Sequence, residues 1–426
     1  MDRRAFLAAA ALPALNPLRS VAQTRRTEVA IRGDAFIING RPTYPGRTYE
    51  GKRIEGLLMN VRVVQGIFDD LNAETAARWV YPDTKTWDVD RNTTEFLAAM
   101  AEWKRHGVLG FTINLQGGSP GSAGGRGRGA GEGGPRAGAA EGAAAGDPTG
   151  RGVATNPPAG ERGAVPTPAA EGARGGRGPA GPQVENSAID PDGNLRPAYM
   201  ARLQRILDKA DELGMVAIVG YFYFGQDQRV KDEAAVVRAV LNATNWILDH
   251  DYRNVLVEVN NECNISYDHD ILKPPRVPEL IALVQKQTRN GRRLLVSTSF
   301  GGTNSGGPRD HPDTPITAAV VKQSDFVLIH GNGPNDPALI QRCIAATRGL
   351  AGYRPMPVLV NEDPNFGFTE PNNHLLTSVG EYVSWGYYEQ GQNDYRNGFQ
   401  SPPVNWTINT DNKKQFFALV KTVTGV

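Results

Sequence analysis

Cysteine is nearly absent from this sequence of 426 residues, which contains only Cys263 and Cys343. Two cysteines are too few for a disulfide framework, and no spacing of cysteine and histidine matches a zinc motif, so both classes are excluded. A single disulfide stays open as an alternative. We favour unpaired thiols, because we expect one cysteine at the end of a strand and the other inside an outer helix.

The sequence also lacks an excess of charge of either sign, since 46 Lys and Arg face 45 Asp and Glu. This balance argues against a protein whose main partner is a nucleic acid or an anionic membrane. A small neutral substrate suits it better. The length allows one large or two medium domains and is sufficient for a sizeable core.

Long apolar runs are missing too, apart from an interrupted one at the N-terminus. Residues 1–22 combine Arg3 and Arg4 with an alanine-rich stretch and a small-residue site that ends at Ala22. This pattern is typical of a twin-arginine signal peptide, with a frayed basic N-terminus as the alternative. The stretch is too short to span a bilayer. We therefore predict export to the periplasm or the medium, with no membrane contact after cleavage.

Large apolar side chains are almost absent from residues 117–184, which consist mainly of Gly, Ala, Pro and Arg. Such a segment cannot bury enough surface to offset the entropy of ordering, so we predict a disordered insertion. Its "RGRG" and "RGGRG" pieces resemble RNA-binding segments, but we favour a plain flexible loop. Apart from this insertion, we predict that residues 23–426 form one domain.

Regular structure is predicted on both sides of the insertion. The run "EVAIRGDAFIINGRPTY" near the N-terminus contains two β-rich stretches with glycine-containing turns, which indicates a β-hairpin. Amphipathic helical stretches, such as residues 196–214 and 232–250, alternate with short apolar runs typical of buried strands. These runs span residues 61–67, 108–115, 215–224, 254–260, 293–300, 325–331, 356–362 and 381–388.

Eight strands with helical crossovers predict a parallel sheet covered by helices, and the count favours a closed (β/α)8 barrel, the TIM barrel. An open doubly wound sheet is the alternative. The barrel is favoured because polar residues follow nearly every strand at its carboxyl end, where barrel active sites are built. An open sheet would concentrate them at one switch point.

Two of the predicted strands end in a glutamate. The stretch "LVEVNNECN" ends the fourth strand at Glu262, and "MPVLVNEDP" ends the seventh at Glu362. In a barrel these carboxylates face each other across the mouth. Glycoside hydrolysis needs such a pair, one group to protonate the leaving oxygen and the other to attack the anomeric carbon or position a water.

The run "EVNNEC" resembles the acid/base motif of strand four in glycoside hydrolase clan A, family 5 (cellulase-like) in particular, and "PVLVNE" resembles the strand-seven nucleophile of that clan. The resemblance covers the order of all eight strands. It implies Glu262 as acid/base, Asn261 as the partner of the sugar 2-hydroxyl and Glu362 as nucleophile. It also places His330 and Trp385 in the sugar subsite, with core packing as the alternative for each.

The chain departs from the family pattern in several places. Cys263 stands where the proline usual to the motif is expected, and Asn332 stands in the segment that commonly supplies a tyrosine after the strand-six histidine. Strand two ends in "NLQGG" instead of an arginine-bearing motif. Asn114 and Gln116 there are candidates to hydrogen-bond a sugar, and Arg62 on strand one is a candidate to replace the missing arginine. These differences indicate a divergent member or a separate family of the clan.

Further candidates follow strand three, where aromatic side chains could stack on a sugar and amides could bind its hydroxyls. "YFYFGQDQ" supplies Tyr221 and Tyr223 there, although half of these side chains should serve barrel packing. Asp268, His269 and Asp270 in "SYDHD" form a conceivable metal cluster, but no second histidine stands at ligand spacing. We predict no metal and no cofactor.

The leading hypothesis is an exported retaining glycosidase that acts on an oligo- or polysaccharide. A catalytically inactive carbohydrate-binding barrel and a divalent-metal barrel hydrolase are the alternatives. A retaining mechanism predicts that the two carboxyl groups lie roughly 5–5.5 Å apart, with the pKa of the acid/base raised. The pattern indicates no particular sugar, linkage or oligomeric state.

Overall fold

The computed structural model describes residues 25–118, 183–301 and 316–426. The predicted signal peptide and nearly all of the predicted insertion lie outside these residues. None of the described helices is long and apolar enough to cross a membrane.

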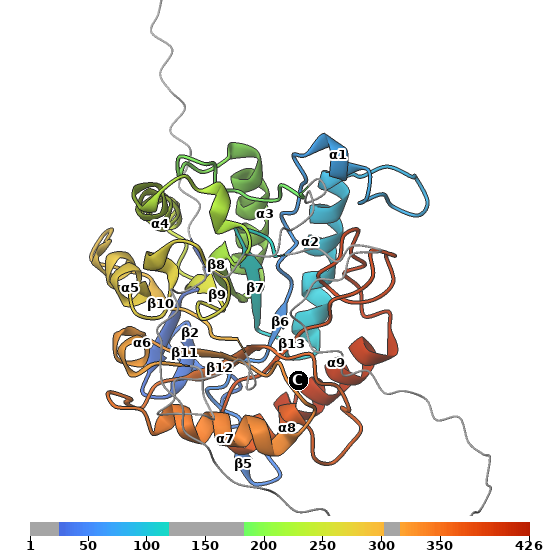
Figure 1. Ribbon diagram of the computed structural model, residues 1–426. Coiled ribbons are helices and arrows are strands. Elements are labelled where there is room, and N and C mark those ends of the chain that lie inside the picture. Colours follow the sequence, from blue (N-terminus) through green and yellow to red (C-terminus); the bar gives the residue numbers. More distant parts are fainter. Residues whose placement is uncertain (1–24, 119–182, 302–315) are drawn as a thin grey trace, which may run out of the picture.

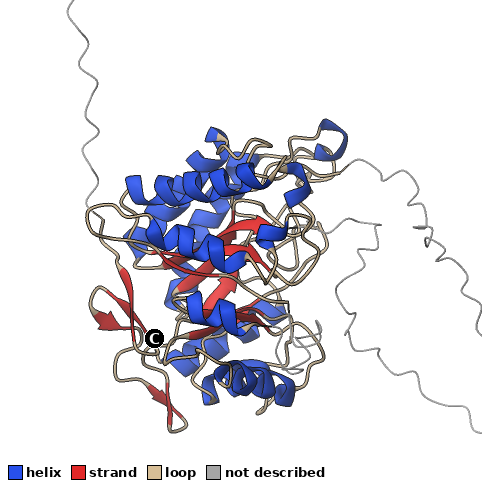
Figure 2. Cartoon of the chain, turned by 60° about the vertical axis from the view of Figure 1, so that its left-hand side comes forward, coloured by secondary structure: helices blue, strands red, loops and turns tan. Residues whose placement is uncertain are grey.

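Eight parallel strands of the described chain form a closed ring at the centre, and helices surround it (Figures 1 and 2). Six of them pair in the order β10-β9-β8-β7-β6-β13, and β11 pairs with β12. In chain order the eight are β6 (Asn60–Arg62), β7 (Gly110–Asn114), β8 (Val216–Tyr223), β9 (Val255–Asn261), β10 (Leu295–Ser297), β11 (Val327–His330), β12 (Val358–Glu362) and β13 (Gly386–Tyr387).

Shorter contacts close the two remaining joints of the ring. Parallel bridges pair Leu359 with Ser384 and Asp363 with Tyr387, which joins β12 to the β13 segment. At the other joint the Asp325 amide donates to the Val296 carbonyl at 3.0 Å, which joins the start of β11 to β10. The predicted barrel is therefore confirmed, and each predicted strand contains one barrel strand or overlaps it.

Helices occupy the predicted crossovers between the strands, and a final helix follows the last strand. They are α1 (Ala73–Ala76), α2 (Val89–Arg105), α3 (Pro197–Leu213), α4 (Glu233–Asp249), α5 (Val277–Lys286), α6 (Ala318–Gln323), α7 (Pro337–Arg348), α8 (His374–Gly380) and α9 (Asp411–Thr424), with single 3₁₀ turns at η1 (Asp227–Arg229) and η2 (Asp270–Leu272).

Local sequence sets the ends of these helices. Proline at the first position begins α3, and Gly214 ends it in the left-handed conformation, with a φ of 71°. The side chain of Asp232 caps α4 by accepting from the Ala235 amide at 2.7 Å. The predicted helices over 196–214 and 232–250 are thus confirmed to within a residue at each end.

The predicted N-terminal hairpin is present and covers one end of the barrel. It consists of β1 (Val29–Arg32) and β2 (Ala35–Ile38), extended by β3 (Arg41–Pro42), and a second hairpin, β4 (Thr48–Tyr49) with β5 (Lys52–Arg53), follows. Phe36 is fully buried and meets Phe326, just before β11, with ring centroids 6.3 Å apart. Apolar side chains from the amino ends of the barrel strands complete this cluster. The hairpin therefore covers the end of the barrel opposite the strand-end glutamates.

The described residues on either side of 119–182 meet beside strand β7. The Gly117 amide donates to the Asn186 carbonyl at 3.2 Å, and the Asn186 side chain donates to the Gly118 carbonyl at 3.1 Å. Gln116 forms an antiparallel bridge with Ser187. The chain thus leaves the barrel and returns to it at nearly one point.

Candidate active site

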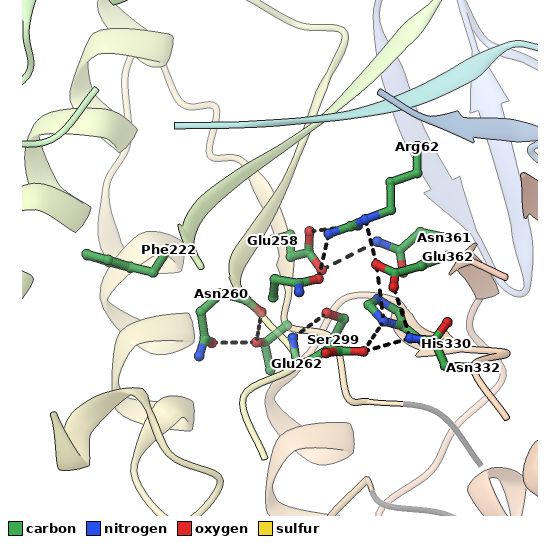
Figure 3. Close-up of polar contacts among 12 residues, drawn as sticks. Arg62, Phe222, Glu258, Asn260, Glu262, Ser299, His330, Asn332, Asn361 and Glu362 are labelled. Atoms are coloured by element: carbon green, nitrogen blue, oxygen red, sulfur yellow. Dashed lines mark hydrogen bonds and ion pairs between the residues drawn. The ribbon is translucent and has the colours of Figure 1, made fainter. Parts of the chain in front are cut away.

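Glu262 and Glu362 lie together at the carboxyl ends of the fourth and seventh barrel strands, β9 and β12 (Figure 3). They are 7% and 5% exposed. The side-chain amide of Asn332 joins them, because its Nδ2 donates to Oε1 of each glutamate at 2.9 Å. One oxygen of each carboxylate lies within 4.8 Å of the other and of a His330 ring nitrogen. The predicted pair therefore lies together at one site.

The backbone at Glu262 is held in an unusual conformation. Its φ is 50°, a left-handed value that costs a non-glycine residue about 1 kcal/mol or more. The loop after β10 supports this conformation: the hydroxyl of Ser299 accepts from the Glu262 amide at 2.9 Å, and its carbonyl accepts from the Cys263 amide at 3.0 Å. The turn aims the Glu262 carboxylate across the barrel mouth towards β11 and β12.

His330 ends β11 and reaches both glutamates with one ring nitrogen. Its Nδ1 lies 2.9 Å from Oε1 of Glu262 and 3.5 Å from Oε2 of Glu362. Burial works to lower the pKa of His330, but the charges of Glu362 and Glu262 outweigh it and raise that pKa above 6.5. The two carboxylates therefore favour the protonated, cationic form of the imidazole.

Arg62, from β6, provides the second cation. Its side chain is fully buried, with Nε 2.6 Å from Oε2 of Glu362 and Nη2 2.6 Å from the side-chain oxygen of Asn261. Burial works to raise the pKa of Glu362, but Arg62, then His330 and then Asn332, lower it below 4.5. These three groups thus favour the ionised form of Glu362.

A third glutamate lies deeper in the barrel, below this pair. Glu258 is fully buried on β9, and its Oε2 lies 3.9 Å from Nη1 of Arg62. Its Oε1 accepts from the Asn361 side chain at 3.4 Å. The sequence analysis did not select Glu258. The signal that could have identified it is a glutamate in the middle of the apolar run "VLVEV".

Three of the other predicted site residues differ in their surroundings. Asn261 lies in the site, and its buried Nδ2 has no hydrogen-bond partner among the described residues. Asn114 points into the barrel interior, where a Cβ added to Gly220 would lie 2.4 Å from its Oδ1. Gln116 supports the end of β8, because its Oε1 accepts from the Tyr223 amide at 3.1 Å. Of these three, only Asn261 meets the cation that holds Glu362.

Two predicted site residues are placed elsewhere, and both require correction. Trp385 is fully buried, and its ring packs against Phe416 of α9 with centroids 5.8 Å apart, while its Nε1 donates to Asp363 at 3.0 Å. Tyr221 points outward, where its hydroxyl meets that of Thr244 on α4 at 3.2 Å. Both side chains belong to the layer between the barrel and its helices.

Two other tyrosines approach the glutamate pair. Burial, then the charge of Glu362, holds the pKa of both Tyr223 and Tyr388 above its ordinary value, so both remain neutral. Tyr388 follows β13 and Tyr223 ends β8. The sequence motif "YFYF" indicated an aromatic at this strand end, but the structure assigns the position to Tyr223 and not to Tyr221.

Glu262, His330 and Glu362 have the spacing of a metal-binding trio. The arrangement nevertheless suits a cation poorly. A metal would meet the Arg62 guanidinium, which already contacts Glu362, and would compete with the hydrogen bond between His330 and Glu262. The side chain of His269, in the other candidate cluster, holds a loop in place, since its Nε2 contacts the backbone carbonyls of Asp227 and Val230 at 3.1 and 2.9 Å.

No disulfide joins Cys263 and Cys343.

The fold and the site together define a (β/α)8 barrel with a paired-glutamate centre at the carboxyl ends of its strands. No protein-family model and no curated protein matches the sequence. Solved structures that resemble it include glycoside hydrolases. One is PbGH5A, a family 5 enzyme from Prevotella bryantii, at 9% identity and a TM-score of 0.47, covering 86% of this chain and 96% of that one.

Two further structures resemble the chain to a similar degree. A putative glycoside hydrolase from Bacteroides vulgatus shares 13% identity at a TM-score of 0.46, with 91% of this chain and 59% of that one covered. A broad-specificity endoglucanase from Clostridium longisporum shares 8% identity at a TM-score of 0.45, and the match covers 87% of this chain and 97% of that one. At these identities and TM-scores, the similarity assigns no activity to this chain. Its function therefore has to be inferred from its own side chains.

Proposed function

We propose that this protein is a retaining glycoside hydrolase that cleaves O-glycosidic bonds of an oligo- or polysaccharide. The observation that carries the proposal is the unequal environment of the two glutamates. Glu362 is held against the Arg62 guanidinium, and Glu262 meets His330 and Asn332 through one oxygen only. The separation supports a retaining mechanism, because oxygens within 4.8 Å suit direct attack better than the roughly 6.5–9.5 Å of inverting pairs.

The first step of the proposed reaction forms a covalent intermediate. The Glu362 carboxylate attacks the anomeric carbon while the bond from that carbon to the leaving oxygen breaks. Glu262 gives its proton to the leaving oxygen. Both hydrogen bonds that the described residues donate to the Glu262 side chain end on Oε1, so Oε2 is the oxygen that carries this proton.

The second step regenerates the enzyme. Water gives a proton to Glu262 and attacks the same carbon, and the bond to Glu362 breaks with retention of configuration. The Asn261 side-chain amide is the candidate to bind the sugar 2-hydroxyl, since its buried Nδ2 lacks a partner among the described residues and its oxygen is held by Arg62. Tyr223 and Tyr388 are candidates to contact the sugar beside the pair.

Two variants separate the roles of the glutamates. Glu362→Gln should abolish turnover of every substrate, because no glycosyl-enzyme can form. Glu262→Ala should retain the first step with an activated aryl glycoside, accumulate the covalent intermediate, and recover turnover with azide as a glycosyl azide of retained configuration. Glu74→Gln, an exposed change on α1, is the matched control and should behave as wild type. Equal loss in both active-site variants without azide rescue would refute the assignment.

The alternatives have distinct signatures in the same assays. Screening of the mature protein on a panel of aryl glycosides and polysaccharides identifies the sugar, and binding without any turnover would indicate an inactive carbohydrate-binding barrel. The trio spacing of Glu262, His330 and Glu362 is the observation that favours a metal-dependent hydrolase. Turnover that survives a chelator would exclude that second candidate.

We also propose export of the protein through the twin-arginine route. The support is the sequence of residues 1–22 alone. Replacing Arg3 and Arg4 by lysine should retain the protein in the cytoplasm, as measured by cell fractionation. Export of the variant at the wild-type level would contradict this proposal.

A further inference from the structure

The buried glutamate below the proposed catalytic pair has a carboxyl group that the two-step reaction does not use. Glu258 lies on β9, four residues before Glu262, and is fully shielded from solvent. Burying an ionised carboxylate costs several kcal/mol unless a cation and hydrogen bonds offset it. Its neighbours are Arg62 at 3.9 Å and Asn361 at 3.4 Å, as Figure 3 shows.

Arg62 connects Glu258 to the nucleophile. The planar guanidinium has a fixed set of donor directions, and each side faces a different acceptor. Nε faces Glu362 and Nη2 faces Asn261, both at 2.6 Å, which leaves Nη1 facing Glu258. Among the described residues, Nε and Nη1 of Arg62 and Oε2 of both Glu362 and Glu258 make these ion pairs and no other hydrogen bond. The ion pair with Glu258 is therefore the interaction that fills the third side of the guanidinium.

The charges of this buried cluster balance only when Glu258 is counted. Arg62 and His330 are two cations, and Glu258, Glu262 and Glu362 are three carboxylates. If both cations are charged, one proton on the carboxylates makes the cluster neutral. Glu362 is held ionised by Arg62. The count allows this proton on Glu262 or on Glu258, and the first step of the proposed reaction requires it on Glu262.

The other titratable groups that face Glu262 add no charge. Tyr223 and Tyr388 approach from β8 and from the segment after β13, and Cys263 follows Glu262 itself. Burial raises the pKa of each of the three, so all remain neutral between pH 4 and about 9. The acidic side chains paired with Arg62 are therefore Glu362 and Glu258.

We propose that Glu258 is a positioning residue for the acid/base: it fixes the Arg62 guanidinium against Glu362 and supplies the negative charge that lets Glu262 hold its proton beside two cations. This inference rests on the proposed glycosidase function. Without the charge on Glu258, two cations would face one ionised carboxylate, and Glu262 would lose its proton more readily.

The variant Glu258→Gln tests this directly, because it removes the charge and preserves the shape. The basic limb of the profile of kcat/KM against pH, which reports the acid/base, should move to lower pH. The expected shift is about one pH unit, the effect of one unit charge across about 10 Å at an effective dielectric of about 20. Glu258→Asp keeps the charge but withdraws it from Arg62, so the basic limb should move by about half as much.

The control for loss of a buried carboxylate is Asp211→Asn. Asp211 is 1% exposed on α3 and accepts from the Thr27 amide at 2.8 Å, outside the barrel interior. The Asp211→Asn variant should have a lower melting temperature than the wild type and an unchanged pH profile. If Glu258→Gln folds and its basic limb stays in place, the positioning role is refuted. If that variant does not fold, Glu258→Asp decides, since its shorter side chain should still move the limb partway, and an unmoved limb refutes the role.

A titration without substrate separates this inference from the proposed function. Carbon-13 NMR of glutamate carboxyl groups, with the Glu262 signal identified by its loss in Glu262→Gln, follows the protonation of Glu262 in any folded protein. Its midpoint should fall by about one pH unit in Glu258→Gln. If the wild-type protein is inactive but Glu258→Gln shows this shift, the glycosidase function is refuted and the coupling between Glu258 and Glu262 stands. If the wild-type protein is active but Glu258→Gln shows no shift, the coupling is refuted and the glycosidase function stands.

Discussion

Arg62→Met gives the sharpest test of the charge arrangement in the barrel. Methionine fills much of the space of arginine but carries no charge, so Glu362 and Glu258 lose the cation that lies 2.6 and 3.9 Å from them. Removing one partner of a buried ion pair costs about 3–5 kcal/mol. We expect a loss of this size in the free energy of unfolding near neutral pH.

The loss of unfolding free energy in Arg62→Met should depend on pH, and the direction of this dependence follows from the pKa of Glu362. In the wild type that pKa lies below 4.5, so the carboxylate contributes stability that is present above 4.5 and is lost as pH falls through the folded value. Without Arg62, burial would raise the pKa of Glu362. The variant would then lose stability as pH rises through this raised value. The difference between the two proteins should therefore be largest near pH 7 and should shrink towards pH 4.

Urea unfolding at intervals between pH 4 and 7.5 measures this difference. Arg202→Met is the matched control, because Arg202 is 6% exposed but donates to the Ile67 carbonyl at 3.1 Å and lies 3.9 Å from Asp69, which is not fully buried. Its loss of stability should be nearly constant with pH. An equal loss for Arg62→Met at every pH would show that Arg62 does not hold Glu362 ionised.

Three further changes test the site and its scaffold. Asn332→Ala removes a hydrogen bond from both glutamates, so kcat should fall about 10–100-fold and the acid limb of the pH profile should rise, because hydrogen bonds to charged groups contribute about 1.5–3 kcal/mol. An unchanged profile would contradict the bridging role. Gly220→Ala would place a Cβ 2.4 Å from Oδ1 of Asn114 and should destabilise the barrel by about 1–3 kcal/mol in urea unfolding. Phe36→Ala should cost about 3–5 kcal/mol in the same measurement and leave KM unchanged, since it empties the cluster with Phe326 at the opposite end of the barrel.

The barrel could be predicted because its strands are buried on both faces. Such strands read as continuous apolar runs, and helical spacing between them reads as crossovers. The strand that carries Glu258 is one example, with seven buried residues in β9. The same logic placed Glu262 and Glu362 at one end of the barrel, since the carboxyl ends of parallel strands meet at one edge.

The direction of side chains at the strand ends could not be predicted. Regular alternation breaks there, as the register shift between Ile329 and His330 shows. A change of one residue exchanges the inner and outer faces. For this reason the sequence pattern assigns Tyr221 and Trp385 to the site although they pack outward. The loop position of Asn332, two residues beyond β11, gave no sign that its amide would bridge both glutamates.

The backbone contacts that join Gly117 and Gly118 to Asn186 have a consequence for the evolution of this barrel. Because the entry and exit points are fixed by the barrel itself, the length of chain between them is nearly neutral to selection for folding: each doubling costs about 0.6 kcal/mol. Point insertions and deletions can accumulate there without drift in the geometry of the glutamate pair. The same junction offers a protein engineer a place to graft a whole foreign module into the barrel.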